Sequence, residues 1–523
     1  MALKIGVDVG GTNTDAVIVD HKCRVLGAEK VPTTKNVGES IYRALDRVLS
    51  SSGVNPQEIK YLMMGTTQCR NAILESRHLA KIGILRLGAP AGLAVEPLYT
   101  WPEELKNAVG NNWAIVNGGV EYDGTLISPV NPEEISEVLY DFKRKGIEAL
   151  AVSSIFSPVS YEQEIRVKQL AQKIFGPAFP ITLSHEVGSI GLLERENSAA
   201  LNAAISKVAA EAANGLEEAL RLRGIEAKTF FSQNDGTLMS LEYAKKFPVL
   251  TICSGPSNSL RGAAFLSGLT NCIVVDVGGT STDIGVMING FPRESADPVE
   301  LGEVKTNFRM PDLISLAIGG GSVVEEVDGV LKIGPRSLGY KLTTDGLAWG
   351  GATFTVTDAF LACRQDNVGY PGADLSNLRN VDTKFGEKVL HKILLDVEMA
   401  VEKIKIRPGP IPIVVVGGGS LLLPNKIGDV EVIRPRYYQY ANALGAAIAQ
   451  VSAEVDRIWA LGDVKREEAL EQTQKQALKK AVSAGADPGS VKVVDVEEVP
   501  LPYMPQRAVR IKVKAIGYLA EVE

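Results

Sequence analysis

The chain has 523 residues, a length that predicts two or three domains, each large enough to bury its own core. Hydrophobic residues make up 45% and charged residues 22%, as in ordinary globular proteins, and the net charge of −7 argues against a general nucleic-acid binder. The five cysteines and four histidines are scattered without a CxxC motif, which argues against a zinc site, an iron–sulfur site and a disulfide framework.

The first part of the chain predicts an α/β domain that opens on a meander. Three apolar runs joined by short polar turns predict consecutive strands at residues 3–11, 16–20 and 24–32. Helical and strand patterns then alternate, as they do in α/β folds. The predicted helices are 37–53, 131–146 and 161–176, and the predicted strands are 59–67, 80–88 and 148–156.

The second part repeats this order and predicts a homologous α/β domain. An Ala-rich stretch at 194–224 predicts one long helix that opens this domain. Further patterns predict strands at 271–279, 283–288, 313–322 and 411–420, a hairpin turn at 289–292 and a long amphipathic helix at 440–462.

The predicted domains are residues 1–180, 181–450 and 451–523. The last of them has the pattern of a small αββ appendage without recognisable chemistry. Its charged stretch at 466–481 mixes both signs, which is typical of a solvated helix face.

One short stretch occurs twice in the chain. Residues 8–15 read DVGGTNTD and residues 276–283 read DVGGTSTD, so the copies differ only at Asn13 against Ser281. Glycines let the backbone bring N–H groups close to an anion, whereas the leading aspartate would repel a phosphate unless a cation such as Mg²⁺ lies between them. A single copy is equally typical of a plain β-hairpin. Two copies in similar domains predict two loops that hold a polyphosphate from both sides.

A third glycine-rich stretch is a candidate site for the base and sugar of a nucleotide. The strand in VVVGGGSLLLP, residues 414–424, ends in Gly417, Gly418 and Gly419. Backbone without side chains can lie flat against a ribose or a purine. A simple turn is the alternative interpretation.

The two repeated stretches and the third glycine-rich stretch follow one another in the order found in the actin-like ATPase superfamily, which the sequence therefore resembles. Proteins of that superfamily carry two phosphate loops and an adenosine loop on duplicated RNase H-like domains. The finer resemblance, over residues 3–450, is to the A-type subunits of the hydantoinase/oxoprolinase family. The segments that carry it are GTTQCRNAILESR (65–77), LERENSAALNAAI (193–205), CSGPSNSLRGA (253–263), IGGGSVVEEVDGVLKIGPRSLG (318–339) and TVTDA (355–359). The chain departs from the family pattern at Asn13, where an aromatic residue is usual, and at 340–351, so it resembles a short, divergent subgroup.

This resemblance implies an ATP-dependent hydrolase of cyclic amides such as hydantoins, 5-oxoproline or lactams. The γ-phosphoryl group of MgATP would pass to the substrate's carbonyl oxygen, and a second enzyme subunit would complete hydrolysis. Asp8 and Asp276 would hold Mg²⁺, directly or through water, and would act in catalysis together with Thr12 and Thr280. The implied nucleotide-binding residues are Gly10, Gly11, Thr12, Asn13, Gly278, Gly279, Thr280, Ser281, Gly417, Gly418 and Gly419.

The expected substrate contacts are Thr66, Thr67, Asn71, Arg195 and Asn197. For Arg195 and Asn197, a helix-capping or salt-bridging role is an equally good interpretation. Asp15 and Asp283 are expected to orient the loops, with simple strand-initiating aspartates as the alternative.

Two other functions stay open at this level. A sugar or small-carboxylate kinase would share the fold and the ATP loops, and Asp123 is a candidate for its catalytic base. An ATP-switched binding or assembly protein is the other, although the family-like segments argue against it. No apolar run is long enough to span a membrane and no signal pattern opens the chain, so we expect a cytoplasmic protein without nucleic-acid or membrane partners. The sequence leaves a homo-oligomer open.

Overall fold

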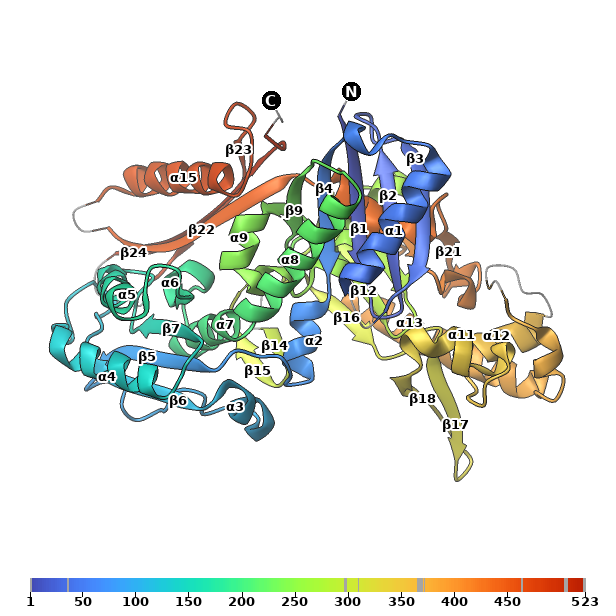
Figure 1. Ribbon diagram of the computed structural model, residues 1–523, viewed down its shortest axis with the longest axis horizontal. Helices are drawn as coiled ribbons and strands as arrows, with labels where there is room; N and C mark the ends of the chain where they lie inside the picture. Colours follow the sequence, from blue (N-terminus) through green and yellow to red (C-terminus); the bar gives the residue numbers. More distant parts are fainter. Residues whose placement is uncertain are drawn as a thin grey trace.

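Two large β-sheets with helices packed on and between them form the body of the molecule (Figure 1). The computed structural model describes residues 2–34, 37–295, 299–308, 310–364, 370, 372–461, 464–502 and 507–520. Within these residues no helix is long and apolar enough to cross a membrane.

The larger sheet has the strand order β23-β24-β22-β10-β9-β4-β1-β2-β3. The predicted meander is confirmed, because β1 pairs antiparallel with β2, and β2 with β3, while β4 lies parallel to β1 on the other side. Apolar side chains of helices α1 (Val37–Ser52) and α8 (Ser206–Leu222) share one buried core with this sheet. Its strands are β1 (Leu3–Val9), β2 (Asn13–Val19), β3 (Val25–Pro32), β4 (Ile59–Thr66), β9 (Lys228–Ser232), β10 (Leu238–Ser240), β22 (Val451–Ala460), β23 (Lys492–Pro500) and β24 (Ala508–Gly517).

The second sheet repeats the centre of the first. Strand β11 pairs antiparallel with β12, β12 pairs antiparallel with β13, and β19 lies parallel to β11. Helices α12 (Val356–Arg364) and α13 (Thr383–Ile404) contribute to the core behind this sheet. Its strands are β11 (Cys272–Val277), β12 (Thr282–Ile288), β13 (Phe291–Pro292), β16 (Leu313–Leu316), β19 (Ile413–Val416), β20 (Lys426–Ile427) and β21 (Val430–Ile433).

Two helices built from small residues join the sheets. Helix α10 (Ser254–Ser267) contacts the second sheet, helix α14 (Ala441–Ile448) contacts the first, and the two helices contact each other extensively. The crossing is tight: a Cβ added at Gly262 would clash with the carbonyl of Ala441, and one added at Gly445 would clash with the carbonyl of Asn258. The two sheets are therefore held through direct backbone contact between these helices.

A smaller parallel sheet is inserted after β4, in the order β6-β5-β7-β8. Its elements are β5 (Ile82–Ala89), α3 (Glu103–Val109), β6 (Asn112–Asn117), α4 (Pro132–Arg144), β7 (Ala149–Ser154), α5 (Glu162–Phe175), β8 (Ile181–Leu183), α6 (Ser184–Val187) and α7 (Leu192–Ala204). The remaining elements are α2 (Gln68–Leu74), α9 (Leu241–Lys246), β14 (Val299–Leu301), β15 (Val304–Thr306), β17 (Ser322–Val327), β18 (Val330–Ser337), α11 (Leu342–Asp345) and α15 (Arg466–Ser483).

Two predicted helices are wrong in their extent. The single helix expected at 194–224 is two helices, α7 and α8, which part at Ile205, because α7 packs on the small sheet whereas α8 packs on α1. The helix expected at 440–462 ends at Ile448, and 451–460 is the strand β22, which is paired along its whole length with β24. In both cases distant packing partners override the local helical pattern.

The C-terminal residues are part of the larger sheet rather than an appendage to it. Strand β22 follows β10 in the sheet through the pair Leu238–Val451, and β24 and β23 extend it further. The domain boundaries at 180 and 450 remain predictions, although the larger sheet takes strands from both sides of each boundary.

Candidate functional site

The two copies of the repeated stretch fold into the same turn. The Gly10 amide donates to the Asn13 carbonyl at 3.0 Å, and the Gly278 amide donates to the Ser281 carbonyl at 2.9 Å. Each turn links two antiparallel strands in which the flanking aspartates face each other, Asp8 opposite Asp15 and Asp276 opposite Asp283. Each copy is therefore a hairpin, and the phosphate-loop interpretation depends on how the two hairpins meet.

The tips of the two hairpins touch. A Cβ added at Gly279 would clash with the Thr12 hydroxyl, so a glycine is required for this approach. Gly11 and Thr280 are exposed, and within the described part of the chain the amides of residues 11, 12, 279 and 280 donate no hydrogen bond. Unpaired amides at a glycine turn are the arrangement that binds anions.

Beneath the tips, two carboxylates are buried. Asp8 is 4% exposed and Asp276 is 8% exposed, and one Asp8 oxygen, Oδ1, lacks a hydrogen-bond partner. Burial, with the charges of Asp15 and Asp276 adding to it, raises the pKa of Asp8 to about 7. Burial likewise raises the pKa of Asp276 to about 6. Both carboxyl groups thus lack a compensating positive charge sufficient to offset their burial.

A divalent cation fits this pair of carboxylates. Among the described residues no three His, Cys, Asp or Glu side chains come together as a complete metal site. Mg²⁺ is commonly held by one or two carboxylates and takes its other ligands from phosphates and water. Asp8 and Asp276 therefore suit Mg²⁺ that arrives with a phosphate rather than a metal enclosed by protein.

Two residues that the sequence analysis did not select connect these carboxylates. The Ser259 hydroxyl on α10 donates to Asp276 Oδ2 at 2.5 Å and also contacts Asn442 Oδ1 on α14. The Asn442 side chain in turn hydrogen-bonds Asp8. Polar side chains among the small residues of CSGPSNSLRGA and YANALGAA were the available signal, since buried polar groups need partners.

The flanking aspartates are tied inside their own sheets. Lys30 Nζ donates to both Asp15 oxygens at 2.5 and 2.6 Å. Asp283 accepts hydrogen bonds from Ser315 and, at 3.4 Å, from Ser281. These bonds suit the expected loop-orienting role of Asp15 and Asp283.

Two further glycine runs pack against the second hairpin. Gly417 has a φ of +88°, and a Cβ there would clash with Asp276 Oδ1, while the Gly419 amide donates to the Val277 carbonyl at 2.8 Å. The run 319–321, expected only as a strand end, donates amides to the Gly278 and Gly279 carbonyls at 3.0 and 2.7 Å. The second hairpin is thus positioned by glycine backbone on two sides.

Residues 4–175 match the hydantoinase/oxoprolinase N-terminal region, and residues 195–374 match the hydantoinase/oxoprolinase domain that follows it. The chain belongs to the hydantoinase/oxoprolinase family. The predicted membership is confirmed, and the family segments at 65–67, 254–259 and 318–322 all lie on elements next to the two hairpins.

Two of the relatives are subunits of enzymes that act on different compounds. The chain is 28% identical to caprolactamase subunit alpha of Pseudomonas jessenii over 392 residues, which are 69% of this chain and 54% of that one. It is 27% identical to the acetophenone carboxylase gamma subunit of Aromatoleum aromaticum over 385 residues, 68% of this chain and 52% of that one. The chain thus spans about half the length of these two relatives.

A solved structure shows the same fold. The crystal structure of ATP-dependent caprolactamase from Pseudomonas jessenii matches with a TM-score of 0.78 and 20% sequence identity, covering 99% of this chain and 89% of that chain. The predicted α/β fold class, with a core that occurs twice, is confirmed by this likeness and by the strand order that the second sheet repeats.

The expected substrate residues fall into two groups. Thr66 ends β4 beside the first hairpin, and Thr67 follows it as the residue that precedes α2. The Thr67 hydroxyl donates to the Val9 carbonyl at 3.3 Å. Asn71 is exposed on the following helix, α2. This placement keeps the three residues as candidates.

Arg195 and Asn197 form hydrogen bonds within the region around α7. Both are buried in α7, and none of their described hydrogen bonds reaches the glycine turns. Arg195 donates to the carbonyls of Ser154 and Ser189, and Asn197 accepts from the Trp101 indole and donates to the Lys305 carbonyl. A buried guanidinium or amide must satisfy its hydrogen bonds locally, so these contacts suit the structural role that the sequence analysis left open. A substrate role for the two residues stays a prediction.

Proposed function

We propose that this chain is the ATP-binding subunit of an ATP-dependent hydrolase of cyclic amides, with Mg²⁺ held by Asp8 and Asp276. The observation that carries the proposal is the pair of buried, uncompensated carboxylates beneath two touching glycine hairpins. An anion that brings a cation satisfies both the free amides and the carboxylates at once. Mg²⁺–ATP has that composition.

The chain's own groups would act by positioning and by electrostatics. Amides at residues 11, 12, 279 and 280 would bind phosphate oxygens, each charge-assisted bond contributing about 1.5–3 kcal/mol. Bound Mg²⁺ would neutralise phosphate charge. The lactam carbonyl oxygen would form a bond to the γ-phosphorus as the bond to the ADP oxygen breaks, which makes the ring carbon a better electrophile. Gly417–Gly419 would contact the adenosine, and Thr66, Thr67 and Asn71 the amide.

The named relatives support this reaction class and a second subunit. Caprolactamase is described as ATP-dependent, and both relatives are named as subunits of larger enzymes. We infer a two-component enzyme, in which the partner completes hydrolysis.

Carboxylation of a ketone is the second candidate reaction. The relative named acetophenone carboxylase gamma subunit favours it, since a ketone oxygen can accept a phosphoryl group at the same site. A kinase has less support. Asp123, its candidate base, accepts the Thr125 amide at 2.9 Å, and this hydrogen bond holds the pKa of Asp123 below its usual range.

The deciding experiment is ATP hydrolysis by the purified protein with Mg²⁺, screened against 5-oxoproline, hydantoins, caprolactam, acetophenone with bicarbonate, and simple sugars. ADP release stimulated by a cyclic amide is the expected result. Stimulation by the ketone would move the protein to the carboxylases, and stimulation by a sugar to the kinases. Slow turnover that no compound stimulates, even with the partner subunit added, would contradict the proposal and favour an ATP-switched assembly protein.

A further inference from the structure

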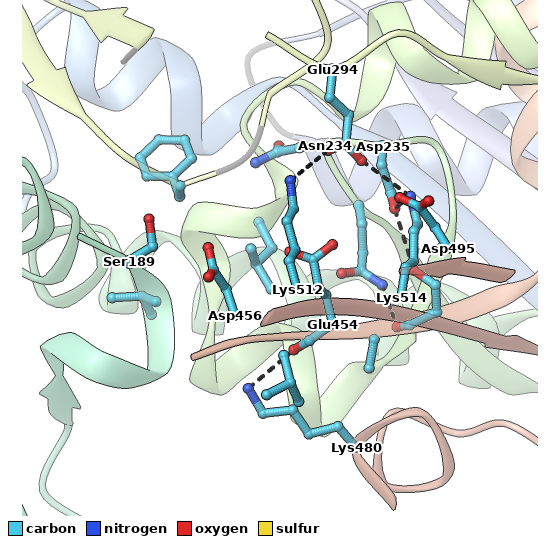
Figure 2. A pocket seen from close by; sticks show the side chains of 18 of the residues that line it. Ser189, Asn234, Asp235, Glu294, Glu454, Asp456, Lys480, Asp495, Lys512 and Lys514 are labelled. Carbon is cyan, nitrogen blue, oxygen red and sulfur yellow. Dashed lines mark hydrogen bonds and ion pairs between the residues drawn. The ribbon is translucent and has the colours of Figure 1, made fainter. Parts of the chain in front are cut away.

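A cavity of about 1160 Å³ lies apart from the glycine hairpins, and none of its lining residues belongs to them. It is bounded by strand β22, strand β24, helix α15 and the segment around α6 (Figure 2). Acidic and basic side chains of comparable number line it, together with apolar ones such as Val187 and Val455. The cavity is large enough for a small organic molecule.

On one side of the two strands the charges neutralise each other. Lys514 Nζ lies 2.6 Å from Asp235 and 3.3 Å from Glu294, and Arg510 pairs with Asp456. Figure 2 shows Lys512, Lys514, Asp235 and Glu294 together on this side, with Lys480 on the opposite side of the strands. The paired charges leave little net field for a ligand.

On the opposite side, Arg457 and Lys480 line the cavity without a carboxylate partner within 4 Å among the described residues. The exposed Lys479, next to Lys480 on α15, also lacks one. The Arg457 guanidinium carbon lies 4.1 Å from the Trp459 ring centre and 5.7 Å from that of Tyr161, and its Nε is buried without a hydrogen-bond partner. Contact with aromatic rings holds the planar guanidinium in one orientation, in which its N–H groups can bind both oxygens of a carboxylate.

Lys480 is the second of these cations. Its described hydrogen bond is to the Glu454 carbonyl at 3.4 Å, a long contact that leaves most of its donor capacity free. Burial lowers the pKa of Lys480, and the charge of the nearby Glu186 carboxylate offsets this effect only in part.

Glu186, in the wall of the same cavity, carries a spare acceptor. Glu186 Oε1 pairs with Lys246 at 2.8 Å, whereas Glu186 Oε2 is buried without a hydrogen-bond partner. The cations of Arg457 and Lys480, the unused Glu186 oxygen and the apolar walls complement a molecule with a carboxylate at one end, an ammonium at the other and a short apolar body.

A docked peptide strand is a poorer fit. Beyond the pair Leu238–Val451, β22 has no described strand on the side away from β24, so its edge could in principle accept one. The Ser452 carbonyl on that edge already accepts from Gln233 Nε2 at 2.9 Å, and the Glu454 carbonyl accepts from Lys480. Side chains thus cap the edge where a strand would bond.

We propose that this cavity binds a small amino-carboxylate, with its carboxylate on Arg457 and Lys480 and its ammonium on Glu186. Hydrolysis of a cyclic amide generates this class of molecule: water adds to the carbonyl carbon, the C–N bond breaks, and the ring becomes a chain with a carboxylate and an ammonium. The identification of the ligand as the reaction product rests on the proposed function. The binding site itself does not.

The test is isothermal titration of the full chain, without nucleotide, with 6-aminohexanoate, hexanoate and hexylamine. Saturable binding of 6-aminohexanoate is expected, at least about tenfold tighter than that of either singly charged compound. Arg457→Gln and Lys480→Gln should each weaken it at least about tenfold, and Arg457→Lys by less. Glu186→Gln should abolish the preference over hexanoate. Lys475→Gln, an exposed lysine on the same helix, is the control and should bind like the unaltered chain.

Absence of saturable binding, or equal binding by the Arg457→Gln and Lys480→Gln variants, would overturn the proposal. Melting curves of each variant separate loss of binding from loss of fold. ATP turnover is measured separately: failure of the titration leaves the ATPase proposal untouched, and a missing response of turnover to cyclic amides leaves the cavity site standing.

Discussion

At the scale of single residues, the site depends on Asp8 and Asp276. Asp8→Asn and Asp276→Asn keep the shape of the side chain but remove the charge that we propose holds Mg²⁺. We expect each to cut ATP turnover at least about a hundredfold without unfolding the protein. Steady-state ADP release and a thermal melt measure both effects. Asp123→Asn, in a surface turn, is the matched control. Wild-type-like turnover in either site variant would contradict the assignment of Mg²⁺ to these two carboxylates.

The buried carboxylates also predict a pH dependence. Because the folded pKa of Asp8 is raised from 3.8 to about 7, the folded protein keeps a proton that the unfolded chain releases. Its contribution to stability is complete below about pH 4 and is lost as the pH rises through about 7. In Mg²⁺-free buffer the wild-type chain should therefore lose stability relative to Asp8→Asn between these pH values. Urea midpoints in EDTA at pH 5, 6, 7 and 8 measure this, and a constant difference would contradict it.

At the scale of elements, the crossing of α10 and α14 sets the distance between the sheets. Gly445→Ala places a methyl group against the Asn258 carbonyl, and Gly262→Ala places one against the Ala441 carbonyl. Backbone atoms cannot move aside cheaply, so each change should lower the free energy of unfolding by about 2–4 kcal/mol. ATP turnover should fall as well, since Ser259 and Asn442 sit on the displaced helices.

The chain provides a control for this prediction. Gly215 lies within α8 with the nearest atom 3.8 Å from an added Cβ. Gly215→Ala should leave stability unchanged or raise it by about 0.5–1 kcal/mol through helix propensity. Denaturant titrations of all three variants measure the free energies of unfolding. Equal changes at the three positions would contradict the view that close backbone contact between α10 and α14 requires the two glycines.

At the scale of the whole molecule, the larger sheet is completed by the last strands of the chain. Val451, Ile511 and Val513 are fully buried in the same core as Ile5 and Val7 of β1. A chain that ends at residue 450 would expose this core and leave β10 as a sheet edge, so we expect it to misfold or aggregate. Circular dichroism and size-exclusion chromatography would show this. A monomeric, cooperatively melting fragment 1–450 would mean that β22–β24 are dispensable.

The features that the sequence determined by itself are local. The turns after Asp8 and Asp276 were predictable because glycines, a flanking threonine and a buried strand lie within eight residues of one another. The duplication was predictable for the same reason, since two short segments with nearly the same sequence form the same type of turn.

Only the tertiary structure decided what depends on distant partners. The strand at 451–460 could not be predicted from its own sequence, because its partner strand, β24, comes much later in the chain. Ser259 and Asn442 join the carboxylates only because two helices cross through glycines. The hydrogen bonds of Arg195 and Asn197 likewise depend on segments that lie far away in the sequence. Local backbone preference acts over a few residues, whereas burial and polar satisfaction are settled by whichever segments the fold brings together.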